Sequence, residues 1–346
     1  MATFAPSLPK TMKSVQYTSS GKPSEVLSFN EAAPLPTVTG SNVLVKVHAT
    51  ALNPVDWKLM KGGLPRLIMP KINVPCLDIS GTVVATGPKA GKKFHIGDEV
   101  LAMLFFARSG GLSEYTLVDE SLLTKKPERW SFEQAAAWPL AACTVWQALV
   151  IRGGIKKGDK VLINGASGGT GTVGVQLAKA LGAYVVGVCS TANVQLVKDL
   201  GADEVVDYKT TDVTEKYTNQ DFNIVFDTVG SAAEIWAKRN TILKPNGNLI
   251  RIAGHEDAFA PLNLLTEGID IGSKKLYSFL TSGPGYHLFT NHPDGEVLSK
   301  TIKALDDAKA YPVIDSVNEF TLPAVLAAFD KSISSRAKGK IIVKII

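Results

Sequence analysis

The chain of 346 residues has little cysteine and no strong excess of charge of one sign. Its 3 Cys are too few for a disulfide framework or for the four-thiolate cage of a structural zinc. Lys and Arg number 37 and Asp and Glu 32, so the formal net charge is +5, and no basic run is present. This balance argues against nucleic acid as the main partner but suits an anionic small molecule.

Long apolar runs are missing as well. No stretch approaches the roughly 18–20 consecutive apolar residues that a membrane helix needs, and the first 17 residues lack the apolar core of a signal peptide. We therefore expect a cytoplasmic protein with reduced thiols and no membrane insertion. A hydrophobic content of 45% excludes a disordered chain, and the length indicates about two domains.

The first third of the chain is rich in short β-strand patterns. Val43–Ala49 approximates apolar alternation, Gly81–Gly87 is bounded by glycines, and Val100–Phe106 follows a turn-like segment. Such strands, separated by Gly and Pro, predict a small barrel or rolled sheet. The proline-rich stretch from Asn53 to Gly91 is expected to be rich in loops and to be able to host a site.

The pattern changes at Ser131, which has the features of an N-cap for a helix over Ala135–Ile151. Strands and helices then alternate, which predicts a doubly wound parallel sheet. The expected strands are Lys160–Asn164, Tyr184–Cys189, Glu204–Asp207, Asn223–Asp227, Asn248–Ala253 and Lys275–Leu280. The expected helices are Thr172–Leu181, Asn193–Leu200, Ala232–Leu243 and Gly295–Lys309. A last strand, Ile341–Ile346, is assigned to the N-terminal β domain, which makes that domain discontinuous.

A glycine-rich turn joins the first of these strands to the first helix. Gly169, Gly171 and Gly174 fit the pattern G-x-G-x-x-G, with a strand before it and a helix after it. Without Cβ atoms the backbone can turn tightly and approach a pyrophosphate, which the helix N-terminus favours electrostatically. We interpret this turn as a dinucleotide site; the alternative is an ordinary glycine-rich turn.

The second strand of this region bears on the choice of dinucleotide. A site for NAD usually ends this strand with Asp or Glu, whereas here the residues are neutral, among them Ser190, Thr191 and Asn193. These side chains offer hydrogen bonds and do not repel a 2′-phosphate, so NADPH is predicted. The arginine expected for NADPH is missing, and Lys198 or Lys209 is a possible substitute. The alternative role for Ser190 and Asn193 is to cap the next helix.

Nearly the whole chain resembles the medium-chain dehydrogenase/reductases, and among them the zinc-free quinone oxidoreductase branch, which is similar to zeta-crystallin. The resemblance rests on segments spread along the sequence: residues 51–56, 78–83, 96–100, 135–142, the glycine turn, 200–208 and 338–343. It implies a discontinuous GroES-like β-barrel domain, residues 1–128 and 312–346, and a Rossmann domain, residues 129–311.

Zinc-dependent relatives carry a catalytic Cys, a His-Glu pair and a four-Cys lobe. This sequence has Asn53-Pro54 and Leu77-Asp78 at the corresponding positions and no cysteine cluster, so no metal site is expected. Without a Lewis acid an alkoxide is hard to stabilise. The resemblance implies instead the reduction of quinones or of C=C bonds conjugated to a carbonyl, by hydride transfer from NADPH.

The resemblance also implies which residues surround the cofactor. Thr144 is expected against the nicotinamide, the loop Ser167–Gly171 around the pyrophosphate, and Lys340 near the cofactor from the C-terminal segment. Other positions follow the ends of predicted strands. The full expected set is Thr144, Ser167, Gly168, Gly169, Thr170, Gly171, Ser190, Thr191, Asn193, Tyr208, Val229, Gly254, Phe279 and Lys340. For Tyr208 a half-buried tyrosine at a strand end, and for Thr144 a hydroxyl bonded to its own helix, are the alternatives.

Candidates for catalysis are fewer. Asn53 is the recurrent cleft residue of the family, and Lys58 stands where relatives often carry a tyrosine. Either side chain is able to donate a hydrogen bond to an enolate. The alternatives are a turn-forming Asn before Pro54 and a solvated surface Lys.

The predicted protein is therefore an NADPH-dependent, zinc-independent reductase of quinones or α,β-unsaturated carbonyls. A trans-acting enoyl reductase of a biosynthetic pathway, or a cofactor-binding protein with mainly an interaction role, are the alternatives. A homodimer formed through the edge strand Lys275–Leu280 is favoured, although Lys274, Lys275 and Tyr277 would equally protect an unpaired edge.

Overall fold

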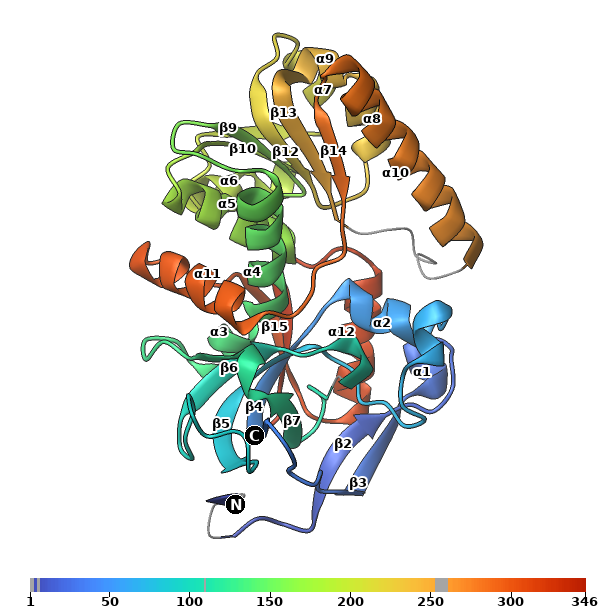
Figure 1. Cartoon of the computed structure of the whole chain (residues 1–346), viewed down its shortest axis with the longest axis vertical. Coiled ribbons are helices and arrows are strands. Elements are labelled where there is room, and N and C mark those ends of the chain that lie inside the picture. The colour runs from blue at the N-terminus through green and yellow to red at the C-terminus, as the bar shows by residue number, and fades with distance from the viewer. Residues whose placement is uncertain (1–2, 5–6, 109, 253–260) are drawn as a thin grey trace. The chain divides into compact units, whose positions relative to one another are not determined.

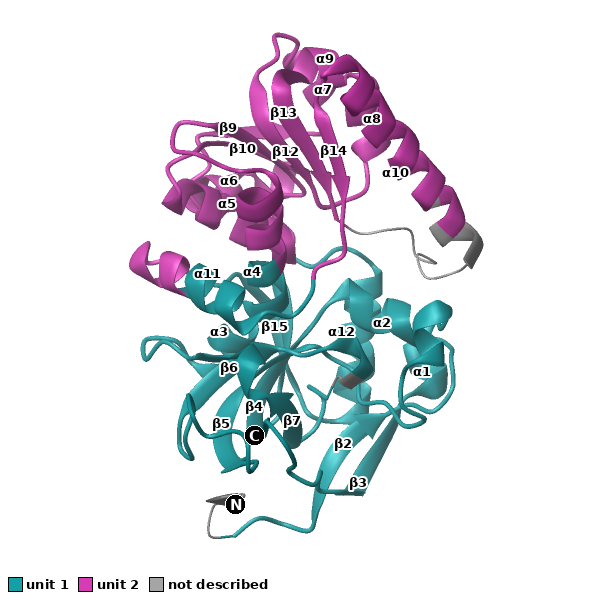
Figure 2. Ribbon diagram, in the orientation of Figure 1, with its two compact units in different colours: residues 1–143, 292–302, 311–346 teal, residues 144–291, 303–310 magenta. Residues whose placement is uncertain are grey.

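The computed structural model describes residues 3–4, 7–108, 110–252 and 261–346. They form two compact units (Figure 2): unit 1 comprises residues 1–143, 292–302 and 311–346, and unit 2 comprises residues 144–291 and 303–310. The domain limits predicted above stay a prediction. No helix in the described part of the chain is long and apolar enough to cross a membrane.

Unit 1 is built on an eight-stranded sheet in the order β15-β16-β4-β5-β6-β8, with β1 paired to β5 and β7 to β4. Its strands are β1 (Thr3–Phe4), β4 (Asn42–Leu52), β5 (Asp78–Thr86), β6 (Glu99–Met103), β7 (Tyr115–Asp119), β8 (Leu123–Lys125), β15 (Ile314–Glu319) and β16 (Lys340–Lys344). A separate hairpin joins β2 (Thr11–Gln16) to β3 (Ser28–Pro34). The β-rich N-terminal part of the prediction is confirmed.

The C-terminal strand completes the N-terminal sheet, as predicted. β16 pairs antiparallel with β4, with Ile342 opposite Ala51, and parallel with β15 (Figure 1). Ile341, Ile342 and Val343 are buried, which explains why an almost wholly apolar segment ends the chain.

Short helices surround this sheet. They are α1 (Pro23–Val26), α2 (Pro54–Met60), α3 (Phe132–Ala136) and α12 (Leu322–Ile333), with 3₁₀ turns η1 (Leu64–Leu67), η2 (Phe106–Arg108) and η3 (Glu120–Leu122). α2 begins after Asn53, where Pro54 occupies the first turn and the Asp56 carboxylate accepts the Asn53 backbone N–H at 2.7 Å.

The helix predicted over Ala135–Ile151 is divided into α3, α4 (Pro139–Val145) and the π-helical segment η4 (Trp146–Arg152). Ser131 caps α3 as predicted, because its Oγ accepts the Gln134 N–H at 3.2 Å. Pro139 lacks an N–H and so separates α3 from α4.

Unit 2 contains a six-stranded parallel sheet in the order β11-β10-β9-β12-β13-β14, as the prediction of a doubly wound sheet requires. Its strands are β9 (Lys160–Asn164), β10 (Tyr184–Cys189), β11 (Glu204–Asp207), β12 (Phe222–Asp227), β13 (Leu243–Arg251) and β14 (Gly285–Leu288). β10 and β11 are added to the sheet on one side of β9, and β12, β13 and β14 on the other side. The topological switch point therefore lies between β9 and β12.

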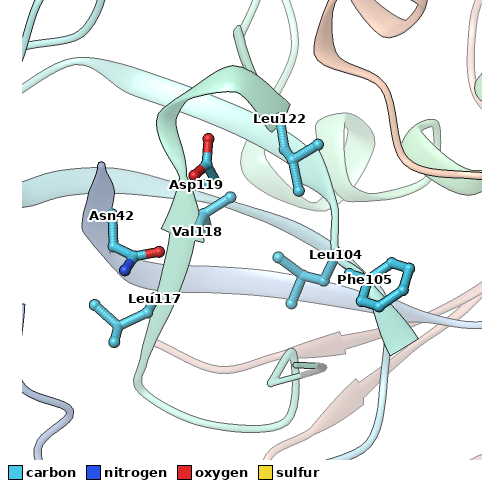
Figure 3. A pocket seen from close by; sticks show the side chains of 7 residues that line it. All are labelled: Asn42, Leu104, Phe105, Leu117, Val118, Asp119 and Leu122. Carbon is cyan, nitrogen blue, oxygen red and sulfur yellow. The ribbon is translucent and has the colours of Figure 1, made fainter. Parts of the chain in front are cut away.

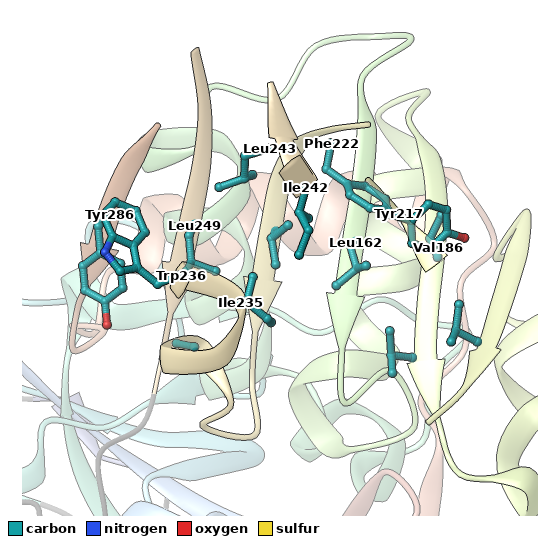
Figure 4. Packing of buried hydrophobic residues seen from close by; sticks show 14 residues of the cluster. Leu162, Val186, Tyr217, Phe222, Ile235, Trp236, Ile242, Leu243, Leu249 and Tyr286 are labelled. Carbon is teal, nitrogen blue, oxygen red and sulfur yellow. The ribbon is translucent and has the colours of Figure 1, made fainter. Parts of the chain in front are cut away.

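Helices pack on this sheet and bury an apolar cluster that includes Leu162, Phe222 and Trp236 (Figure 4). They are α5 (Gly169–Ala180), η5 (Thr191–Asn193), α6 (Val194–Asp199), α7 (Val213–Lys216), α8 (Ala232–Ala237), α9 (Arg239–Ile242) and α10 (Pro261–Thr281). A further helix, α11 (Gly295–Asp307), confirms the helix predicted over this region.

The strand predicted over Lys275–Leu280 is wrong. These residues form the last turns of α10, and the sixth strand is β14, which follows them. The helical spacing is visible only over the whole 21-residue segment, where Ile271 and Tyr277 pack against the core of unit 2. These residues therefore cannot form the edge strand through which a homodimer was expected to pair. The homodimer itself stays a prediction.

Candidate functional site

The glycine turn lies between the ends of three strands of unit 2. Gly165 follows β9 with a φ of +82°, and a Cβ there would lie 2.5 Å from Thr228 Oγ1 and from Val229 Cγ1. A Cβ on Gly171 would collide with the carbonyl oxygen of Gly165. Gly174, in contrast, has room, since its nearest contact would be 3.5 Å away. The close approach of backbone to backbone thus depends on Gly171, while Gly165 is required by its positive φ and by the Thr228 and Val229 side chains.

Helix α5 starts at this turn. Gly168 is its N-cap, and Gly169 and Thr170 form its first turn. The N–H groups of a first helical turn have no partner within the helix and, with the helix dipole, favour an anion. The tight turn, which a Cβ on Gly171 would disrupt, together with these N–H groups, fits a dinucleotide pyrophosphate.

Three predicted cofactor residues meet beside the turn. Asn193 Nδ2 donates to Ser167 Oγ at 3.0 Å and to Ser190 Oγ at 3.3 Å. Asn193 Oδ1 is buried and has no hydrogen-bond partner among the described residues. A buried acceptor without a donor is unfavourable in the protein alone and fits a hydroxyl donor supplied by a ligand.

A carboxylate that sequence reasoning missed lies next to this group. Asp207 ends β11 in register with Cys189 of β10 and accepts the Lys209 N–H at 3.0 Å. Hydrogen bonds from the Thr191 hydroxyl and from the Lys209 backbone lower the pKa of Asp207. The dinucleotide motif places its carboxylate at the end of the second strand, whereas the ends of parallel neighbouring strands lie in the same layer of the sheet. Tyr208 follows, with 61% of its surface exposed.

The end of β12 is held by a buried carboxylate. Asp227 Oδ1 accepts Asn164 Nδ2 at 3.0 Å and the N–H groups of Val229 and Gly230 at 3.2 Å. Asp227 Oδ2 is buried and has no partner among the described residues. The backbone of Val229 is therefore fixed at the switch point, while its side chain is exposed.

The remaining predicted residues of unit 2 are dispersed. Thr144 is buried near the end of α4, and its hydroxyl accepts Asn291 Nδ2 at 2.7 Å, a partner that no sequence motif signals. Phe279 lies on α10 with 82% of its surface exposed, and not at the end of a strand. Gly254 lies outside the described residues.

Unit 1 contains a buried polar cluster formed by Asn53, Asp78 and Lys340. The Lys340 ammonium lies 2.9 Å from Asp78 Oδ2 and donates to Asn53 Oδ1, and Asn53 Nδ2 donates to Asp78 Oδ2 at 2.8 Å. Asp78 Oδ1 accepts the Leu140 N–H at 2.7 Å. The cluster joins the corner after β4, the start of β5 and the start of β16, which are far apart in the sequence.

Two further ionisable groups lie beside this cluster. Burial raises the pKa of Asp56 to about 7, and its Oδ1 has no hydrogen-bond partner in the described part of the chain. Burial also raises the pKa of the Cys76 thiol well above its usual value. Cys76 has a φ of +73°, a conformation that non-glycine residues rarely adopt and that recurs at functional sites.

Lys58 and Lys340 occupy different environments. Lys58 is half-buried on α2, with its ammonium 5.5 Å from the centre of the Trp57 ring. Lys340, predicted near the cofactor, is buried and paired with Asp78. Asn53 is buried as well, and both ends of its amide are engaged within the cluster.

One hollow of unit 1 lies away from the predicted site residues. It has a volume of about 330 Å³ and is lined by Asn42, Leu104, Phe105, Leu117, Val118, Asp119 and Leu122 (Figure 3). Across the described residues of both units, no three His, Cys, Asp or Glu side chains are placed to hold one metal ion.

Known proteins are similar to this chain in sequence and in fold. Residues 39–128 match the family model "Alcohol dehydrogenase GroES-like domain", and residues 200–343 match "Zinc-binding dehydrogenase". The chain is 34% identical to the chloroplast envelope quinone oxidoreductase homolog of Arabidopsis thaliana, covering 97% of this chain and 99% of that protein. It is also 34% identical to a trans-enoyl reductase of Aspergillus terreus, over 99% and 98% of the two chains. The quinone oxidoreductase from Coxiella burnetii superposes with a TM-score of 0.81 at 27% identity, over 97% of this chain and all of that one.

Proposed function

Because this chain belongs to the medium-chain dehydrogenase/reductase superfamily, in its quinone oxidoreductase-like branch, we propose that it is an NADPH-dependent, zinc-independent reductase. Its substrates are quinones or the C=C bond of α,β-unsaturated carbonyls. The observation that carries the proposal is the tight glycine turn of Gly165 and Gly171 at the switch point of the unit 2 sheet. It lies beside Asn193 Oδ1, which is buried and has no hydrogen-bond partner among the described residues. NADPH, when bound, supplies the hydride.

The residues of unit 2 bind and orient this cofactor. The loop Ser167–Gly171 takes the pyrophosphate, and Ser190, Thr191, Asn193 and Tyr208 take the adenosine end. The Asp207 carboxylate disfavours a 2′-phosphate. This carboxylate already accepts hydrogen bonds from the Thr191 hydroxyl and from the Lys209 backbone N–H, and the positive charge of Lys209 partly offsets its negative charge. We therefore still favour NADPH over NADH.

The residues of unit 1 serve the substrate. When a hydride adds to a conjugated C=C bond, negative charge develops on the carbonyl oxygen, and a nearby hydrogen-bond donor or cation stabilises it. We assign donation to Lys58. Asn53 is engaged through both ends of its amide, so we assign it the positioning of Lys340 instead of direct donation. Asp78 has both oxygens occupied, by Lys340 and by the Leu140 N–H, which supports a zinc-independent reaction.

Cofactor oxidation tests the proposal. The protein is mixed with NADPH or NADH and a panel of 1,4-benzoquinones and short enones, and absorbance at 340 nm is followed. We expect turnover with at least one acceptor and a kcat/KM for NADPH about tenfold above that for NADH. Binding of NADPH without oxidation by any acceptor would exclude an enzyme of this class and leave the interaction role.

A matched pair of variants tests the glycine turn. Gly171→Ala forces a Cβ against the Gly165 carbonyl, whereas a Cβ on Gly168 meets that same oxygen at an ordinary 3.4 Å. We expect Gly171→Ala to weaken NADPH binding at least tenfold and Gly168→Ala to retain most of it, as measured by calorimetric titration. Equal affinities in the two variants would contradict the assignment of the pyrophosphate to this turn.

Trans-acting enoyl reduction is the second candidate, because a trans-enoyl reductase matches this chain as well as a quinone oxidoreductase does. Comparing kcat/KM for an enoyl thioester and for a quinone with the same NADPH-loaded protein separates them. A preference for the thioester above tenfold would favour the second candidate. A cytoplasmic location stays a prediction in either case.

A further inference from the structure

A short loop of unit 1 holds four large apolar side chains in solvent. The loop, residues 62–73, follows α2 and contains the 3₁₀ turn η1. The exposed fractions are 46% for Leu64, 80% for Leu67, 64% for Ile68 and 56% for Ile72. Single exposed apolar residues are common on proteins, but a contiguous group of this kind marks an interaction surface.

Hydrogen bonds within the loop and to the segment before α1 hold the loop in this shape. Arg66 Nη1 donates to the Pro70 carbonyl at 2.8 Å, and Arg66 Nη2 donates to the Thr18 carbonyl at 2.7 Å. Asn73 exchanges backbone hydrogen bonds with Tyr17 and donates from its side chain to the Pro70 carbonyl at 2.7 Å. The apolar side chains are therefore held outward by a scaffold that joins the loop to the strand region before α1.

The segment that contains the loop carries charge of one sign. Between residues 57 and 77 the chain has four basic residues, Lys58, Lys61, Arg66 and Lys71, and no acidic one. Lys61 and Lys71 are exposed. The acidic residue Glu25, on the neighbouring α1, accepts the Lys22 N–H at 3.2 Å. Exposed aliphatic side chains with a basic rim are the combination that partitions into the headgroup region of an anionic bilayer.

Helix α10 of unit 2 offers an informative contrast. It also exposes apolar side chains, among them Leu276 and Leu280. Its charges are balanced, however, since the segment 261–281 has two acidic and two basic residues and Lys274 pairs with Asp270 at 2.6 Å. Charge complementarity to an anionic surface therefore selects the loop 62–73 over α10.

We propose that the loop 62–73 docks unit 1 onto an anionic lipid surface. Leu67 and Ile68, the most exposed of the four, enter the headgroup region, and Lys61 and Lys71 face the lipid phosphates. The contact is peripheral, and it does not depend on the function proposed above.

Vesicle co-sedimentation of the full chain tests this proposal. Vesicles of phosphatidylcholine alone are compared with vesicles that contain 30% phosphatidylserine. We expect binding to the anionic vesicles only, and its loss in 0.5 M NaCl because the electrostatic part is screened. The variant Lys61→Gln/Lys71→Gln removes two charges and is expected to lower the partition coefficient roughly 25-fold, about fivefold for each charge.

Apolar variants locate the contact. Leu67→Ser/Ile68→Ser is expected to lower partitioning at least tenfold, whereas the matched double variant Leu276→Ser/Leu280→Ser on α10 leaves it within twofold. All four side chains are exposed, so thermal unfolding is expected to stay at the wild-type midpoint in both variants and to show that each is folded.

Three results would overturn the proposal. The first is equal binding to neutral and anionic vesicles, or none to either. The second is a loss of binding in the α10 variant with the loop variant unaffected. The third is a wild-type dimer, measured by light scattering, that becomes monomeric in the loop variant without a change in partitioning, because the loop would then be covered by a second copy of the chain.

Discussion

At the scale of single residues, burial decides what the polar groups of unit 1 are able to do. Asn53 has a side chain suited to donate to a substrate, but its amide N–H is directed to Asp78 and its oxygen accepts Lys340. Lys340 in turn is buried with its charge opposed by Asp78. The three side chains therefore act as one unit, and changing one alters the others.

The first prediction concerns the ion pair of this cluster. Lys340→Met leaves Asp78 as a buried charge without its cation, so we expect the free energy of unfolding in urea to fall by about 3–5 kcal/mol. The control is Lys344→Met, which removes an exposed pair with Glu133 at 3.8 Å and is expected to cost less than about 1 kcal/mol. Adding Asp78→Asn to Lys340→Met should recover part of the loss. An equal loss of unfolding free energy in Lys340→Met and Lys344→Met would show that burial does not strengthen the ion pair of Lys340 with Asp78.

The second prediction concerns Asp56. Its pKa is about 7 in the folded protein and near 3.9 in an unfolded chain. Between these values the folded state holds a proton that the unfolded state has released, so this residue makes stability fall as pH rises from about 4 to about 7, with no further change above.

Asp56→Asn removes that dependence. The difference in unfolding free energy between pH 5 and pH 8 should be smaller in the variant than in the wild type by roughly 2–3 kcal/mol. Asp315→Asn is the control. Burial raises the pKa of Asp315, but the Lys331 ammonium and the Lys338 backbone N–H outweigh it and lower this pKa. Asp315 is therefore ionised at both pH values, and its replacement should lower the free energy of unfolding by the same amount at pH 5 and pH 8. A wild-type slope that survives Asp56→Asn would show that Asp56 is ionised throughout.

At the scale of elements, α10 shows how far a local pattern can mislead. Six residues, Lys275–Leu280, fit a strand, but the surrounding 21 form one helix that packs on the core through Ile271 and Tyr277. A segment of six residues is too short to reveal a hydrophobic period of 3.6 residues, whereas a helix of more than five turns reveals it. Four strands of unit 2, β9 to β12, were predicted to within one residue, because each is short and bounded by turns. β13 begins at Leu243, five residues before the predicted start, and β14 was not predicted.

The third prediction tests this helix. Gly268 and Gly272 lie within α10, where an added Cβ meets nothing within 4 Å. Gly268→Ala and Gly272→Ala should each raise the free energy of unfolding by about 0.5–1 kcal/mol, because alanine favours a helix. Gly230→Ala has equal space but a φ of +103°, so it should lower stability. A loss of stability in all three would argue against the helix.

At the scale of the whole molecule, the chain returns to its first unit at its end. β16 lies between β4 and β15 and carries Lys340 into the buried cluster. Unit 1 is therefore complete only after the last strand has been made, although most of its residues precede unit 2.

The fourth prediction follows from this connection. Deleting residues 338–346 removes β16, which leaves β15 without its paired strand and unpairs one edge of β4 at residues 49–52. Unit 1 should therefore lose its cooperative unfolding transition and the near-UV circular dichroism of Trp57, Trp130 and Trp138. A shorter deletion of Ile345 and Ile346 keeps β16 and should retain both signals. An unchanged midpoint in the longer deletion would show that unit 1 does not need this strand.

The sequence by itself determined the elements whose information is local. Apolar strands with turns between them, the Ser131 cap and the glycine turn follow from residues close together in the chain, because their conformations depend on neighbouring side chains and on φ. The family, and with it the class of reaction, could also be inferred from motifs.

Only the tertiary structure decided which distant residues meet. Lys340 and Asp78 are 262 positions apart, and Asn291 reaches Thr144 across 147. Asp207 lies opposite Cys189 because β11 is parallel to β10 and ends in the same layer. The pKa of a carboxyl such as Asp56 likewise depends on burial, which is set by all the elements packed around it and not by the residues beside it in the chain.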